Sequence, residues 1–245
     1  MKSASDTVTR KAGPAAGERR NYQQELDRIL LQQQEKRPRL LLHSCCGPCS
    51  SSVLEYLTQF FEVTVFWYNP NIYPQEEFDR RLLAQRELLE KMGFAGRVGL
   101  MTVPRDSAPW YRATQGLEGE PEGGARCTEC FRLRLREAAE AAARGGYDWY
   151  CSTLTLSRHK DPVRINALGE AFAEEFHVRW LPSEFKKRGR ELRSQQLCAQ
   201  YGIYRQNYCG CEYSLAKRNV QPDERPTPAP VTQAVDSPRK NKMEV

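Results

Sequence analysis

Most of the nine cysteines in this chain fall in three short clusters, and these are the residues best suited to chemistry. The clusters are a Cys-Cys-Gly-Pro-Cys turn, a C-x-x-C pair and a C-x-C pair, formed by Cys45, Cys46 and Cys49, by Cys127 and Cys130, and by Cys209 and Cys211. An odd number of cysteines argues against a framework of structural disulfides, and clustered free cysteines more often bind metal or carry out redox reactions. The sequence therefore predicts a thiolate-based metal or redox centre.

The first cluster lies where an apolar run at 39–44 gives way to a helical pattern. Unpaired backbone N–H groups and the positive end of the helix dipole favour thiolate over thiol at such a position. We therefore expect low thiol pKa values at this turn, which suit both metal ligation and nucleophilic redox reactions. His43, which precedes the turn, fits two interpretations equally, as a ligand and as a hydrogen-bonding residue.

The two cysteine pairs add further sulfur ligands. Cys127 and Cys130 are three residues apart at the predicted start of a helix, so both sulfurs share one face. This half-site occurs in zinc ribbons, iron–sulfur sites and thioredoxin-type motifs. Cys209 and Cys211 can chelate one metal or close a small strained disulfide of the labile, catalytic kind. Together the clusters exceed the four ligands that one structural zinc site needs, which favours electron chemistry.

The remaining cysteines and histidines fit ordinary packing or surface roles. Cys151 lies in an apolar strand pattern and Cys198 on an apolar helix face, so both are expected to be packing residues. His159 and His177 are expected to be ordinary surface residues. The chain has no G-x-x-x-x-G-K-[ST] and no G-x-G-x-x-G motif, so neither a P-loop nor a dinucleotide site is evident and electrons must come from an outside donor.

Strand and helix patterns alternate along the chain. The predicted strands are 39–44, 62–68, 98–103, 148–155 and 178–181; the predicted helices are 21–35, 50–61, 74–92, 128–144, one that starts at Pro162 after the capping residue Asp161, and 190–201. This alternation predicts right-handed crossovers and an α/β fold, a mostly parallel sheet with helices on both faces. Sites in such sheets form beyond the carboxyl ends of the strands, where the first cysteine turn lies.

Composition sets the domain organisation and limits the partners. We expect a single α/β catalytic domain at 21–220, a disordered tail at 1–20 and a disordered Pro-rich tail at 221–245. The net charge of +6 suits an anionic partner or a solvated surface equally well. No apolar run is long enough to span a bilayer and the N-terminus lacks the apolar core of a secretory signal, so we expect a cytoplasmic protein without a membrane partner.

Five motifs resemble those of the QueH family of epoxyqueuosine reductases, in the same order. They are LLLHSCCGPCSS at 40–51, FWYNPNIYPQEEFDRR at 66–81, RCTECFRLRL at 126–135, STLTLSRHKD at 152–161 and YCGCEYS at 208–214. The resemblance covers about 40–214, most of the chain outside the predicted tails. It implies a three-layer sandwich similar to nucleotide-binding α/β proteins of the PP-loop kind, in agreement with the alternation above.

The resemblance also implies a reaction, a cofactor and site residues. The reaction is cobalamin-independent reduction of the epoxide of tRNA-bound epoxyqueuosine to queuosine. The implied cofactor is a [4Fe–4S] cluster and the implied redox-active, catalytic pair is Cys209 and Cys211; the implied cluster ligands are Cys45, Cys46, Cys127 and Cys130. A competing account of the family adds a second, single iron beside the cluster, with Cys49 and some of the other cysteines as ligands. Four residues of family motifs near strand ends are expected to position substrate or supply protons: Tyr68, Asn69, Lys160 and Asp161.

The implied partners are the anticodon region of tRNA and an external electron donor. The basic stretch Lys186–Arg190, with Arg193, is the expected phosphate contact, which would make tRNA affinity salt-sensitive. The aromatic residues expected to stack on unpaired bases are Trp180, Phe185, Tyr201, Tyr204 and Tyr208. Core packing is an equally good interpretation of Trp180 and Phe185.

Two functions of other classes fit the same cysteines. One is a zinc-stabilised tRNA-binding module without redox activity, and the other is a general thiol–disulfide oxidoreductase without metal. A brown colour in anaerobically purified protein would favour the iron–sulfur interpretation over both.

Overall fold

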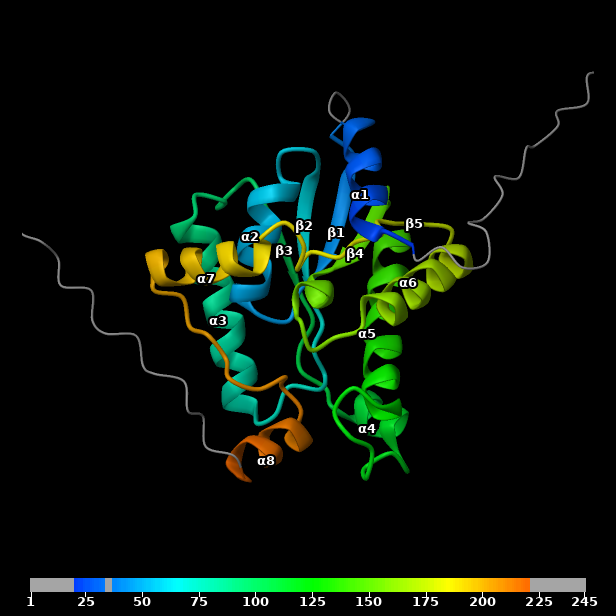
Figure 1. The fold of residues 1–245 in the computed structure, drawn as a ribbon, viewed down its shortest axis with the longest axis vertical. Helices are drawn as coiled ribbons and strands as arrows, with labels where there is room; N and C mark the ends of the chain where they lie inside the picture. The colour runs from blue at the N-terminus through cyan, green and yellow to red at the C-terminus, as the bar shows by residue number, and fades with distance from the viewer. Residues whose placement is uncertain (1–19, 34–36, 221–245) are drawn as a thin grey trace, which may run out of the picture.

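The computed structural model describes residues 20–33 and 37–220 (Figure 1). Its strands are β1 Arg39–His43, β2 Glu62–Trp67, β3 Gly99–Thr102, β4 Trp149–Ser152 and β5 Arg179–Trp180. Its helices are α1 Tyr22–Leu31, α2 Gly47–Leu57, α3 Gln75–Lys91, α4 Ala108–Thr114, α5 Ala125–Arg144, the 3-10 helix η1 Thr153–Leu156, α6 Pro162–Phe176, α7 Arg190–Tyr201 and α8 Glu212–Val220.

The strands form one five-stranded sheet in the order β3-β2-β1-β4-β5, and every neighbouring pair is parallel. Leu41 of the central strand β1 lies opposite Thr64 of β2 and Tyr150 of β4. The apolar residues Leu40–Leu42 are fully buried because helices cover both faces of the sheet. The predicted α/β fold with a parallel sheet is confirmed.

Two helical layers enclose the sheet. Figure 1 shows α2, α3 and α7 on one side of the strands and α5 and α6 on the other. Helix α2 packs against α3 and α7, and α5 packs against α4 and α6. The chain leaves β1 towards β2 and leaves β4 towards β5, so the strand order reverses between β1 and β4. Ligand sites in open α/β sheets form at this switch point, beyond the carboxyl ends of the two strands.

Several element bounds differ from the sequence prediction. Helix α2 starts at Gly47, three residues early, because Cys46 caps it. The fourth strand ends at Ser152 and the chain continues as η1, while helices α4 and α8 were not predicted. Arg20, assigned to the N-terminal tail, instead pairs with Glu25 and Glu170. The rest of both predicted tails lies outside the described residues.

Candidate active site

The cysteine turn follows β1 at the switch point, and its backbone is shaped by a helix start. Cys46 is extended and its Sγ accepts a hydrogen bond from the Cys49 backbone N–H at 3.3 Å, which caps α2. Gly47 brings the start of α2 against α3, since a Cβ atom there would lie 2.9 Å from the carbonyl oxygen of Ala84. This close approach requires glycine between the second and third cysteines.

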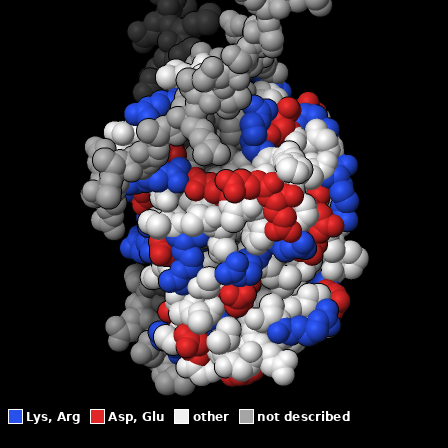
Figure 2. All heavy atoms as spheres, turned by 90° about the vertical axis from the view of Figure 1, so that its right-hand side faces the viewer, with Lys and Arg blue, Asp and Glu red and all other residues white. Residues whose placement is uncertain are grey.

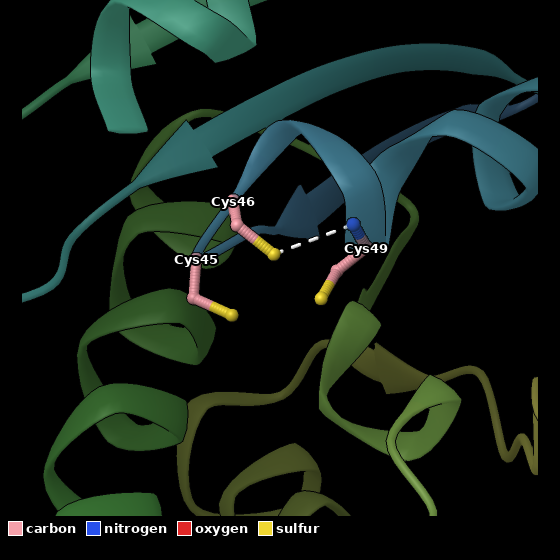
Figure 3. Close-up of side chains that lie close together, drawn as sticks. All are labelled: Cys45, Cys46 and Cys49. Carbon is pink, nitrogen blue, oxygen red and sulfur yellow. Dashed lines mark hydrogen bonds between the residues drawn. The ribbon is translucent and has the colours of Figure 1, made fainter. Parts of the chain in front are cut away.

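The three sulfurs of this turn point into one space (Figure 3). The Sγ atoms of Cys45, Cys46 and Cys49 all lie within 4.8 Å of one another. Hydrogen bonds from Cys46 and Cys49 lower the pKa of Cys45, and the nearby charges of Arg134 and Lys160 act in the same direction. Cys45 is therefore the thiol of the three that ionises most readily.

The other two thiols of the turn do not follow the sequence prediction. Burial and the hydrogen bond to Cys45 raise the pKa of Cys46, and the hydrogen bond to Cys45 raises that of Cys49 to about 12. The expected low pKa values are thus confirmed for Cys45 and wrong for its two neighbours, because closely packed sulfurs cannot all carry charge.

The two cysteine pairs meet beside this turn. Cys130 and Cys211 are buried together against Trp110. Cys127 and Cys209 line a cavity of about 80 Å³, and both also line a neighbouring cavity of about 380 Å³ with Cys211. Burial raises the pKa of Cys130 to about 11. The two pairs therefore lie together, and all nine cysteines in the chain are free thiols.

A buried arginine, Arg134, connects these segments. Its Nη2 donates to Asn69 Oδ1 at 2.7 Å and its Nη1 lies 3.9 Å from the Sγ of Cys130. Asn69 in turn donates to the carbonyl oxygen of Ser44, directly before the cysteine turn, at 2.8 Å. Sequence reasoning missed Arg134; the available signal was a cation one helical turn after Cys130 on the apolar face of α5.

A second buried arginine, Arg81 of α3, holds the C-x-C loop. It pairs with Glu77 at 2.7 Å and donates to the carbonyl oxygens of Cys209 at 3.0 Å and Tyr208 at 3.2 Å. Gly210 between the two cysteines has a φ of 135°, which favours glycine, and a Cβ there would lie 3.0 Å from Arg81 Nη1. Arg81 belongs to a family motif, but its spacing gave no indication of this role.

Gln206 covers the cysteine turn from the loop after α7. Its Nε2 donates to the Sγ of Cys46 at 2.9 Å and lies 3.9 Å from that of Cys49. Its Oε1 is buried and has no hydrogen-bond partner among the described residues.

His43 is not available as a ligand. It is fully buried, its Nε2 donates to the Tyr68 carbonyl oxygen at 3.2 Å, and its Nδ1 accepts from the Ser152 hydroxyl at 2.7 Å. Burial lowers the pKa of His43 to about 3, so the ring is neutral. The hydrogen-bonding interpretation is confirmed and the ligand interpretation is wrong.

The remaining sequence candidates divide between structural and cavity positions. Cys151 and Cys198 are buried in the core, as predicted. His159 and His177 are exposed, although His159 also lines the 80 Å³ cavity. Of the four motif residues, Asn69 is a buried connector, Asp161 caps α6, Tyr68 offers its carbonyl oxygen to His43, and Lys160 lines the same cavity.

The donor set fits a metal–thiolate group. Sulfur ligands select zinc or iron–sulfur centres. Arg134 Nη1 lies 3.9 Å from the Sγ of Cys130, Lys160 lines a cavity with Cys127 and Cys209, and neither cation has a carboxylate partner among the described residues. Buried cations need anionic partners, which a metal bound by several thiolates supplies. Of the expected ligands, Cys45 and Cys46 belong to the close trio of sulfurs, whose third member is Cys49.

The predicted tRNA patch is largely paired with acidic residues. Arg190 is buried over the ring of Tyr56 and donates to Gln23, so its assignment as a phosphate contact is wrong. The other basic residues of the patch pair with acids: Lys186 and Lys187 with Glu184, Arg188 with Asp27, and Arg193 with Glu55. They remain candidates only where phosphate can displace these partners.

The burial of the aromatic candidates and the charge of one face limit where RNA could bind. Trp180 and Phe185 are buried, which makes them core residues and not stacking platforms, while Tyr201, Tyr204 and Tyr208 are half-buried. Figure 2 shows a row of acidic side chains across the face on the right-hand side of Figure 1, with basic ones scattered around it. That face is poorly suited to binding phosphates.

Within the described residues, no helix is long and apolar enough to cross a membrane.

Known proteins show clear similarity to the chain. The family model described as "Epoxyqueuosine reductase QueH" matches residues 40–217. A protein of that name from Staphylococcus epidermidis is 38% identical over 82% of this chain and 87% of its own length. Proteins of the same name from Streptococcus pyogenes and Haemophilus influenzae are each 38% identical, over 82% and 76% of this chain and 82% and 75% of their own lengths.

Proposed function

Because the chain belongs to the epoxyqueuosine reductase QueH family and is an oxidoreductase, we propose that it reduces the epoxide of epoxyqueuosine in tRNA to the alkene of queuosine. The observation that carries this proposal is the close trio of sulfurs at the switch point of the sheet, with both cysteine pairs along adjoining cavities and with cations that have no carboxylate partner among the described residues. This edge is where α/β proteins bind their substrates. The proposed place of action is the cytoplasm.

The reaction sets the demands on the site. Removing the oxygen of an epoxide takes two electrons and two protons, and yields an alkene and water. When bound, a [4Fe–4S] cluster held by Cys45, Cys46, Cys127 and Cys130 supplies single electrons from an external donor. Cys209 and Cys211 can release two electrons and two protons together as a dithiol becomes a disulfide.

A cavity beside the cysteine pairs supports this chemistry. The 380 Å³ cavity is within the usual size of a small-molecule site and can accept one modified base. Cys209 and Cys211 line it, and Arg81 holds their loop in place through the Cys209 carbonyl oxygen. Arg134 and Gln206 contribute donors to the sulfurs of Cys130 and Cys46, which stabilises negative charge there.

The close trio supports a second, single iron beside the cluster. Cys49 is not among the expected cluster ligands, yet its sulfur lies within 4.8 Å of those of Cys45 and Cys46. We include Cys49 as one ligand of that iron. Anaerobic protein with about five irons per chain would support this, whereas about four irons would leave the cluster alone. Colourless protein with bound zinc would favour the tRNA-binding module without redox activity.

The test of function is nucleoside analysis of tRNA. A host that accumulates epoxyqueuosine receives the chain, or its Cys209→Ser or Cys211→Ser variant, and its tRNA is digested and separated. We expect queuosine with the unaltered chain and with the control variant below, and none with Cys209→Ser or Cys211→Ser, both of which should retain iron. Cys198→Ser is the matched control, because Cys198 lies in the core beside the hydroxyls of Ser51 and Ser194. Full queuosine in both variants would exclude the catalytic pair, and none with the unaltered, iron-loaded chain would refute the function.

A further inference from the structure

Lys160 is a cation beside two of the cysteines, Cys127 and Cys209, and its ammonium has no hydrogen-bond or carboxylate partner among the described residues. It lies in the loop between η1 and α6, where its backbone N–H donates to the Ser157 carbonyl oxygen at 3.3 Å. The half-buried side chain lines the 80 Å³ cavity together with Cys127 and Cys209. Its neighbour Asp161 is occupied, because it caps α6 through the Val163 N–H.

The other cations around the two cavities are committed or exposed. Arg164 donates to the Gly123 carbonyl oxygen and the Thr128 hydroxyl. Arg126 donates to two carbonyl oxygens, those of Leu117 and Glu118. His159 and Lys217 are exposed to solvent. Among the described lining residues, Lys160 is thus the half-buried cation with donors free for a bound molecule.

The cavity that Lys160 lines adjoins the larger one. The 80 Å³ cavity and the 380 Å³ cavity share Glu122, Cys127 and Cys209 as lining residues. A molecule bound in the larger cavity therefore meets Lys160 where the two cavities adjoin, beside the sulfurs of Cys127 and Cys209.

We propose that Lys160 is a catalytic residue that donates a hydrogen bond to the substrate oxygen which is removed. This assignment rests on the proposed function. In that reaction both C–O bonds of the epoxide break, the two ring carbons form a double bond, and the oxygen leaves as water. Two electrons come from an external one-electron donor and two protons come from solvent.

The physical role of Lys160 is to stabilise charge on that oxygen as the first C–O bond breaks. A donor fixed in a partly desolvated site is already oriented before reaction, and removing one such donor typically costs about 10²- to 10³-fold in rate. The same hydrogen bond distinguishes substrate from product, since the alkene has no ring oxygen to accept it.

The experiment compares Lys160→Met and Lys160→Arg with the unaltered chain. Lys91→Met is the control for loss of one positive charge, because Lys91 is exposed at the far end of α3, where it pairs with Glu87. One readout is the single-turnover rate with tRNA carrying the epoxide. The other is the ratio of dissociation constants for tRNA carrying the alkene and tRNA carrying the epoxide, measured also on metal-free protein.

We expect Lys160→Met to lose about 10²-fold or more in rate and to bind both tRNAs equally. Lys160→Arg should recover part of the rate and part of the preference for the epoxide. Lys91→Met should match the unaltered chain in both readouts. A Lys160→Met variant that keeps its rate, or keeps the preference for the epoxide, would overturn the assignment. If Lys160→Met loses bound metal, the ratio of the two dissociation constants on metal-free protein tests the assignment in place of the rate. An unaltered chain with neither turnover nor preference would instead refute the proposed function, and the role of Lys160 with it.

Discussion

Replacing Arg81 by methionine should release the C-x-C loop and destabilise the protein. The change removes the donors to the Cys209 and Tyr208 carbonyl oxygens and leaves Glu77, whose side chain is 10% exposed, without its cation. Breaking a buried ion pair from one side costs about 3–5 kcal/mol. We expect a loss of that size in the free energy of unfolding, measured with urea.

Two contributions to this loss, the unpaired carboxylate and the lost hydrogen bonds to the loop, can be separated. In the double variant Arg81→Met, Glu77→Gln no unpaired carboxylate remains, so its stability should exceed that of the single variant by about 1–3 kcal/mol. The deficit that persists measures the hydrogen bonds to the loop. Arg86→Met, at an exposed position of the same helix, should stay within about 0.5 kcal/mol of the unaltered chain.

Release of the C-x-C loop can be measured by cysteine alkylation and by amide hydrogen exchange. Once freed from α3, Cys209 should react faster with an alkylating reagent, as measured by peptide mapping. The Tyr73 amide, which donates to the Gly210 carbonyl oxygen at 2.8 Å, should exchange its hydrogen faster. A destabilisation below about 1 kcal/mol, with unchanged alkylation and exchange, would show that other contacts hold the loop and that the reasoning is wrong.

Further predictions test the turn, the core histidine, the cluster and the RNA contact. Gly47→Ala should cost about 1–3 kcal/mol in urea unfolding, because its Cβ would press on the backbone of α3; an unchanged midpoint would contradict this packing. His43 has a pKa of about 3 when folded and about 6.5 when unfolded, so the unfolded chain binds more protons as pH falls. Stability should therefore fall by about 2 kcal/mol from pH 7 to pH 5, a slope that should be absent in His43→Gln. Cys130→Ser should lose iron and the thiolate-to-iron absorption; full iron would remove Cys130 from the ligands. Alanine at both Lys186 and Lys187 should flatten the salt dependence of tRNA binding, and an unchanged slope would show that their pairs with acid persist in the complex.

The sequence was sufficient for the scaffold and for the place of the site. Apolar runs such as 40–42 and 63–67 predicted the strands, because strands buried on both faces must be apolar. The parallel order then placed the first cysteine turn at the carboxyl edge. The C-x-x-C and C-x-C pairs lie together along one cavity and one buried cluster, and a single centre shared with the first turn stays a prediction.

What escaped prediction were contacts between distant segments. Charged residues are ordinarily exposed, so nothing in the local pattern marked Arg81 as buried, and Arg134 was marked only by its place on the apolar face of α5. The basic stretch after residue 185 looked free, but its acidic partners Asp27 and Glu55 are supplied by α1 and α2. Spacing likewise could not show that Cys49 joins the close trio, because that depends on where its sulfur points.

The wide spacing of the site along the chain has a consequence for how the protein is made. Gln206 reaches Cys46 across 160 residues, and Arg81 reaches the Cys209 carbonyl oxygen across 128. Contacts of such length form late, since the chain between them must be ordered first. A growing chain on the ribosome therefore exposes the Cys45–Cys49 turn long before the C-x-C loop exists to cover it. Loading of the proposed iron is expected to be a late, post-translational event, and the unfinished chain passes through a period in which bare thiols are open to oxidation.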